Sequence, residues 1–155
     1  MTQACSIVTV RRQHTAVVRA EVPFAEIPAA QRASRAKLAA VLPSFDVGAL
    51  GRTCTRWRPP VAGKLDMEMG TIVAHAFVAS RVPGGEVMPS ELPAGRAAHF
   101  VLKGPFDGLP WAWQTLFQWC EAEKLKPAGI NWEIYGVSEG IDPAAQETEL
   151  YVLLA

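Results

Sequence analysis

Apolar residues recur at helical spacing in two segments of the chain. In the later segment they are Leu109, Ala112, Trp113, Leu116, Trp119 and Cys120. In the earlier, alanine-rich segment they are Ile27, Ala30, Ser34, Leu38 and Val41. Pro110 suits the first turn of the later helix, and Asp107 is placed to cap it. Pro127 and Gly129 are expected to end the later helix, as Pro43 ends the earlier one.

Short runs with the character of strands flank both helices. They are Ile7–Val10, Thr15–Val22, Cys54–Trp57, Leu65–Ala74, Val87–Leu92, Arg96–Leu102, Trp132–Tyr135 and Thr148–Leu154. Two helices among many short strands predict an α+β fold with an antiparallel sheet.

One segment of the chain is repeated. Pro23–Pro28 recurs 82 positions later as Pro105–Pro110, and each copy follows an extended apolar stretch and opens a helix. We therefore predict tandem strand–helix–strand–strand repeats, at about residues 5–80 and 85–155, within a single domain of residues 1–155. Arg81–Gly85 is the expected join. Such halves tend to pair about a pseudo-twofold axis and form a curved sheet with a central groove. The repeated Phe24 and Phe106 are predicted to be core anchors.

Composition removes several classes of function. Half of the 155 residues are apolar, 19% are charged, and basic and acidic residues number 15 each. This balance argues against direct nucleic-acid binding, so Arg52, Arg56 and Arg58 are interpreted as solvated loop or edge charges. No apolar run is long enough to span a membrane, and no nucleotide-binding loop is present, so we expect no membrane association and no cofactor. The histidines are scattered, which predicts no metal site. The cysteines are far apart and suggest reduced thiols in the cytoplasm: Cys5, Cys54 and Cys120.

The most informative segment is Asn131–Tyr135. In a strand, Glu133 and Tyr135 share one face, while Trp132 and Ile134 point to the other. A carboxylate held among aromatic rings suits a lipophilic cation, and the same carboxylate can act as a general acid or base. An exposed acid on an edge strand is the alternative interpretation.

The equivalent run in the first repeat places Thr55 at the position of Glu133 and Trp57 at that of Tyr135. We predict that all four contact ligand. Four further ligand contacts are predicted: Trp111, Trp113, His99 and Phe77. Core packing is the alternative for Trp113, and a structural role is the alternative for His99.

The second half resembles a known family. The segments that carry the resemblance are Glu91–Arg96, Lys103–Leu109, Trp119, Leu125–Gly129, Trp132–Tyr135, Asp142–Pro143 and Glu147–Tyr151. They are similar to the GyrI-like small-molecule-binding domain, also called the AraC-type effector-binding domain. The first half fits more loosely and departs from the family pattern at Cys54–Trp57, where tyrosine is common. The resemblance implies two repeats around a groove for hydrophobic or cationic molecules, here in a stand-alone form.

The resemblance leaves three functions open. The favoured one is binding of lipophilic small molecules, cations among them, for sensing or sequestration, with Glu133 and Tyr135 in the binding site. The second is a hydrolase that opens cyclopropane-bearing or similar electrophilic natural products, with Glu133 and Tyr135 as catalytic residues. The third is docking of a partner protein, as some members dock on gyrase. Whether the chain forms a homodimer is also left open.

Overall fold

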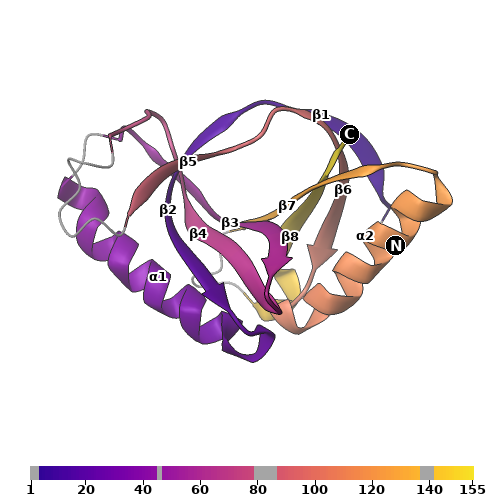
Figure 1. The fold of residues 1–155 in the computed structure, drawn as a ribbon, viewed down its shortest axis with the longest axis horizontal. Helices are drawn as coiled ribbons and strands as arrows, with labels where there is room; N and C mark the ends of the chain where they lie inside the picture. The colour runs from indigo at the N-terminus through magenta and orange to yellow at the C-terminus, as the bar shows by residue number, and fades with distance from the viewer. Residues whose placement is uncertain (1–3, 45–46, 79–86, 137–141) are drawn as a thin grey trace. The chain divides into compact units, whose positions relative to one another are not determined.

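The structure is a computed structural model that describes residues 4–44, 47–78, 87–136 and 142–155, apart from the side chains of Pro60 and Val61. The described residues form two helices and eight strands that pair antiparallel, which confirms the predicted α+β class (Figure 1). In chain order these are β1 (Ser6–Val10), β2 (Gln13–Val22), α1 (Ile27–Val41), β3 (Leu50–Val61), β4 (Lys64–Val73), β5 (Met88–Leu92), β6 (Gly95–Lys103), α2 (Leu109–Ala122), β7 (Pro127–Tyr135) and β8 (Glu147–Leu154). The predicted join at Arg81–Gly85 lies outside the described residues.

The chain divides into two compact units. We call them the α1 unit, which comprises Arg12–Leu92, and the α2 unit, which comprises Met1–Arg11 and Pro93–Ala155. The strand order is β3-β4-β2-β5 in the α1 unit and β1-β6-β8-β7 in the α2 unit. Strand β1 therefore pairs with β6 of the later repeat, and β5 pairs with β2 of the earlier repeat. Each repeat contributes its first strand to the sheet of the other.

In the α2 unit, the helix covers one face of the four-stranded sheet. Three cross-strand rows lie on this face, in the order β6, β8, β7: Ala98–Val152–Asn131, Phe100–Leu150–Glu133 and Leu102–Thr148–Tyr135. The apolar members of these rows pack against Ala112, Leu116 and Cys120 of α2, with Trp113 and Trp119 partly buried beside them. The predicted apolar stripe of this helix is confirmed.

The α1 unit repeats this design with smaller side chains. Ala16 and Val18 of β2 and Val73 of β4 pack against Leu38 and neighbouring residues at the end of α1. The corresponding rows are Ala16–Thr71–Thr53, Val18–Met69–Thr55 and Ala20–Met67–Trp57. The β2 and β6 members of equivalent rows are separated by the 82 residues of the sequence repeat.

The ends of several elements differ from those expected. Asp107 makes no capping hydrogen bond to α2, because a 3₁₀ turn at Phe106–Gly108 places Gly108 at the N-cap. This helix ends before Pro127, where Lys124 adopts a left-handed backbone with φ of 57°. Strands β3 and β4 extend to a two-residue turn, in which Ala62 and Gly63 both have positive φ. Positive φ at both positions suits the right-handed twist of a hairpin, but Ala-Gly is not a strong sequence signal for such a turn.

Candidate functional site

Glu133 and Tyr135 lie on the face of the β7 strand that α2 covers. Glu133 is directly opposite Leu150, and Tyr135 is directly opposite Thr148, both on β8. Only 2% of Glu133 and 5% of Tyr135 is exposed. The alternative interpretation of Glu133 as an exposed acid is therefore wrong, since the helix lies over a strand position that looks solvent-facing in the sequence.

Two aromatic donors hold the Glu133 carboxylate. The indole nitrogen Nε1 of Trp113 donates to Oε2 at 2.6 Å, and the phenol of Tyr135 donates to Oε1 at 2.5 Å. Hydrogen bonds to a charged acceptor are shorter and stronger than those between neutral groups. The helix and the strand are thus joined through one carboxylate, and Trp113 combines core packing with a polar contact.

Aromatic rings surround this carboxylate. Trp113 stacks on Phe117 with ring centroids 5.7 Å apart, and Phe106 meets the edge of Tyr135 at 5.6 Å. Phe106 and Phe117 are each 38% exposed, so the prediction of Phe106 as a core anchor is wrong, as it is for Phe24 at 73% exposed. Phe24 and Phe106 each lie in the short 3₁₀ turn that precedes a helix, outside the layer between that helix and its sheet. The sequence interpretation did not include Phe117, although its spacing of four residues from Trp113 places it on the same helix face.

The α1 unit has an uncharged counterpart of this arrangement. Gln31, at the helix position equivalent to Trp113, donates through Nε2 to Oγ1 of Thr55 at 3.4 Å. The Thr55 hydroxyl also lies 3.1 Å from the sulfur of Met69. The strand register confirms that Thr55 is equivalent to Glu133 and Trp57 to Tyr135. In the first repeat, the buried side chains at the equivalent positions beneath the helix are therefore neutral, and they include the sulfur of Met69.

His99 lies on the opposite face of the α2-unit sheet from Glu133. Its ring nitrogen Nε2 is 3.0 Å from Oε1 of Glu149, and the ring is 4.7 Å from that of Tyr151. Tyr151 in turn stacks on Trp132 at 5.1 Å. The sheet therefore separates His99 from the carboxylate with which the sequence grouped it.

The two remaining predicted contacts belong to different units. Trp111 is 55% exposed on α2 and meets Phe100 edge-on at 5.9 Å. Phe77 is partly buried against the core of the α1 unit. Of the predicted contacts within the α2 unit, the structure brings only Glu133, Tyr135 and Trp113 into one bonded group.

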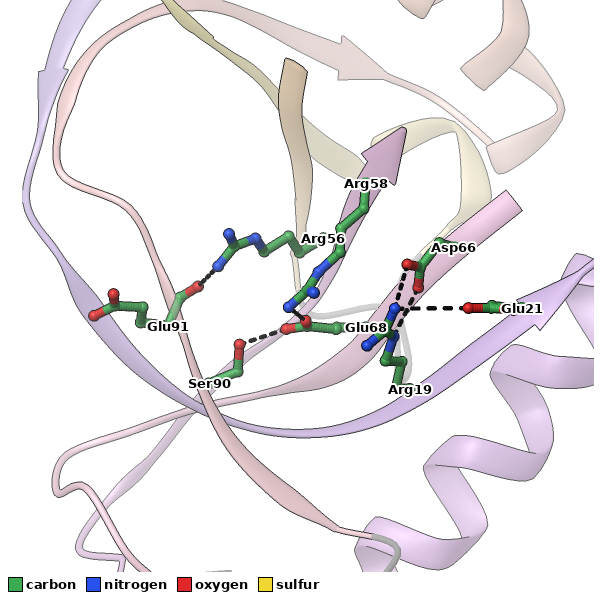
Figure 2. A network of polar contacts seen from close by, with 8 residues as sticks. All are labelled: Arg19, Glu21, Arg56, Arg58, Asp66, Glu68, Ser90 and Glu91. Carbon is green, nitrogen blue, oxygen red and sulfur yellow. Dashed lines mark hydrogen bonds and ion pairs between the residues drawn. The ribbon is translucent and has the colours of Figure 1, made fainter. Parts of the chain in front are cut away.

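The face of the α1-unit sheet that points away from α1 carries a network of charged side chains (Figure 2). Arg19 binds Asp66 through two hydrogen bonds of 2.7 and 3.0 Å, and Arg58 pairs with Glu68, which also accepts from Ser90. Asp66 and Glu68 are 2% and 3% exposed.

Arg56 on β3 adds a second link to β5, the strand of Ser90, by donating to the backbone carbonyl of Glu91 at 2.6 Å. Both Arg56 and Arg58 are partly buried, so their interpretation as solvated charges is wrong. Because these acids and bases already pair across β2, β3, β4 and β5, we regard the network as a structural link between the strands.

Within the described residues, no three His, Cys, Asp or Glu side chains gather as a metal ion would require. None of the described helices has the length and apolar character needed to cross a membrane.

The chain matches the model of the GyrI-like small molecule binding domain over residues 3–155 and belongs to that family. The resemblance inferred from sequence is thereby confirmed. A search of curated proteins found no match.

Solved structures share this fold at low sequence identity. The C-terminal domain of EcmrR is 19% identical, with a TM-score of 0.72 over 100% of this chain and 99% of that one. SAV2435 bound to tetraphenylphosphonium is 7% identical, with a TM-score of 0.73 over 98% and 94% of the two chains. A hydrolase from Listeria innocua is 13% identical, with a TM-score of 0.60 over 97% and 91%.

Proposed function

We propose that this GyrI-like domain binds lipophilic small molecules, cations among them, at the Glu133 carboxylate of the α2 unit. The observation that carries the proposal is a carboxylate only 2% exposed, bonded to Trp113 and Tyr135 and bordered by further aromatic rings. Aromatic faces attract a cation, and a buried carboxylate neutralises its charge. The binding of tetraphenylphosphonium by the structurally similar SAV2435 supports the same ligand class.

Binding requires the side chains that cover Glu133 to move. A drug-sized cation cannot reach a carboxylate that is 2% exposed unless one of its covering groups moves aside. Trp113 is partly exposed and stacks on the half-exposed Phe117, so these two rings are the covering groups that would move aside. A cation that displaces the indole would replace a hydrogen bond with an ion pair.

The first test removes the charge of the site. Glu133→Gln keeps the size of the side chain and one acceptor oxygen, but it removes the negative charge and replaces the second acceptor with an NH2 donor. We expect the affinity for tetraphenylphosphonium and a cationic dye to fall about 10- to 100-fold, the equivalent of about 1.4–2.8 kcal/mol. Titration calorimetry gives the affinities, and quenching of tryptophan fluorescence provides an independent signal.

Glu149→Gln is the matched control. Glu149 lies on the opposite face of the same sheet and contacts His99 and Tyr151, so its loss should leave binding unchanged. Equal affinity in the Glu133→Gln variant and the wild type, or failure of the wild type to bind any lipophilic probe, would contradict the proposal.

A hydrolase is the second candidate. The contact of 2.5 Å between the Tyr135 phenol and the Glu133 carboxylate supports it, because such a pair can orient a water and move a proton. The similarity of the fold to the Listeria innocua hydrolase adds only structural support. Turnover of a cyclopropane-bearing electrophile, followed by mass spectrometry and abolished in Glu133→Gln while binding persists, would establish hydrolysis. Binding in the ratio of one ligand per chain without any product would exclude it for that compound.

A further inference from the structure

Two buried polar side-chain atoms in the strand rows on either side of Glu133 have no hydrogen-bond partner among the described residues. Six such side-chain atoms occur among the described residues: Arg56 Nε, Trp57 Nε1, Arg58 Nε, Asn131 Oδ1, Gln146 Nε2 and Thr148 Oγ1. The three that belong to the α2 unit all lie on β7 and β8 or directly before β8. Buried polar groups in proteins are almost always paired, so each of these atoms calls for an explanation.

Thr148 is the most informative of these residues. It is fully buried, and its hydroxyl has no partner among the described residues. It lies directly opposite Tyr135 in the row Leu102–Thr148–Tyr135, on the face that α2 covers. Side chains opposite one another on antiparallel strands have Cβ atoms about 4.5–5.5 Å apart. The Thr148 side chain therefore begins beside that of Tyr135, whose phenol donates to Glu133.

A second unpaired group lies on the other side of the carboxylate. Asn131 occupies the row next to Glu133, two residues before it on β7, and its side-chain oxygen is buried with no hydrogen-bond partner among the described residues. The row of Glu133 thus lies between two rows that each hold a neutral hydrogen-bonding group, Asn131 in one and Thr148 in the other.

The other repeat shows that packing alone does not require this hydroxyl. At the position equivalent to Thr148, the α1 unit has Met67, which is also fully buried beneath its helix and lies opposite Trp57. The same scaffold thus accepts a purely apolar side chain at this row. A buried hydroxyl without a partner lowers stability relative to an apolar side chain, which makes a role in recognition the better explanation for Thr148.

We infer that Thr148 is a specificity-determining residue, whose hydroxyl bonds to a neutral polar group on a ligand that is held at Glu133. This inference rests on the proposed function. The expected ligand is therefore not a plain hydrocarbon cation. It carries a hydroxyl, carbonyl or amide group next to its charged or apolar centre. A site that bonds such a group discriminates against analogues that lack it, because its own polar atom is then left unpaired.

The experiment compares tetraphenylphosphonium with its three monohydroxylated derivatives, which carry one hydroxyl at the ortho, meta or para position of one ring. Calorimetry measures the affinity of each for the wild type, Thr148→Val and Thr148→Ser. We expect the wild type to bind at least one hydroxylated isomer about tenfold more tightly than the parent ion. Thr148→Val should lose this preference while keeping its affinity for the parent, and Thr148→Ser should retain the preference.

Thr71→Val is the matched control, since Thr71 is a buried threonine on β4 of the other unit. It should leave both affinities and their ratio unchanged. A preference for the hydroxylated isomer that survives in Thr148→Val, or a wild type that binds all four ions equally, would overturn the assignment of Thr148 and leave the proposed function intact. If the wild type binds none of the ions, both proposals are wrong.

Discussion

Cys54 is an ionisable residue whose pKa is changed by its surroundings in the α1 unit. The thiol is 1% exposed on β3, on the face that points away from α1, in the row next to Glu68. Burial, and then the negative charge of Glu68, raises the pKa of Cys54 from 9.0 to about 12. Because the thiolate is the reactive form, Cys54 should be inert at neutral pH.

The raised pKa of Cys54 predicts a pH-dependent loss of stability. The folded state holds the thiol neutral, whereas the unfolded chain releases the proton near pH 9.0. The contribution of the buried neutral thiol to the free energy of unfolding is therefore fully present below pH 9 and is lost as the pH rises toward 12. Between these values, the free energy of unfolding should fall more steeply in the wild type than in Cys54→Ala. Urea titrations at several pH values would show this, and parallel curves for the two proteins would contradict it.

At this scale, the sequence was informative about which side chains share a face but not about what covers that face. Alternation along Asn131–Tyr135 correctly places Glu133 with Tyr135, because adjacent strand residues point to opposite sides. The burial of Glu133 depends on a helix that lies elsewhere in the chain. The same limit explains the incorrect placement of Phe24 and Phe106: local spacing does not reveal whether the turn before a helix is covered.

The C-terminal end of α2 has a backbone geometry that its sequence does not predict. Leu125 N donates to the Cys120 carbonyl at 2.9 Å, and Lys124 N donates to the Glu121 carbonyl at 3.1 Å. These two bonds form a Schellman motif, in which the residue with left-handed backbone is usually glycine. Here it is Lys124, so the helix ends earlier than Pro127 and Gly129 indicate.

Replacing Lys124 with glycine should stabilise the protein. Glycine adopts the left-handed conformation without the steric cost that a side chain carries, although it loses more backbone entropy on folding. We expect Lys124→Gly to raise the free energy of unfolding by about 0.5–1 kcal/mol, measured by urea denaturation. Lys126→Gly is the control, since Lys126 has no positive φ, and it should not stabilise the protein. An equal or lower stability for Lys124→Gly would show that the cap is not strained.

The elements themselves could be predicted because their order follows local patterns. Both helices and their apolar stripes appear where periodicity places them, and the duplicated segment Pro23–Pro28 opens each helix through the same 3₁₀ turn. Element ends were harder to predict, since Gly108 rather than Asp107 occupies a cap and Ala62 adopts a turn that its residue type does not favour.

Across the whole molecule, two copies of one scaffold have diverged in polarity. Thr55, Trp57 and Met67 in the α1 unit correspond to Glu133, Tyr135 and Thr148 in the α2 unit. The sequence repeat makes the first two correspondences visible. It does not reveal the third, because the significance of Thr148 depends on its hydroxyl having no hydrogen-bond partner in the part of the chain that the structure describes.

The exchange of first strands predicts how half-length chains behave. Residues 12–92 contain all four strands of the α1 unit, so they should fold as a monomer. Residues 1–78 lack β5, and β1 is the strand that corresponds to it. Light scattering after gel filtration should show residues 1–78 as a dimer in which each copy lends β1 to β2 of the other. A well-folded monomer of residues 1–78 would contradict this.

The dipeptide Arg11–Arg12 connects β1 to β2 and determines whether β1 can fold back on β2 or must pair with another strand. In the structure, Val10 lies opposite Gly95, whose equivalent in the first repeat is Gln13. The same register within one half would therefore close β1 onto β2 as a hairpin with Arg11 and Arg12 as its loop. Arginine pairs do not favour the positive φ that such a loop requires, whereas Asn-Gly does. Asn-Gly at these positions should convert the swapped dimer of the half-length chain into a monomer.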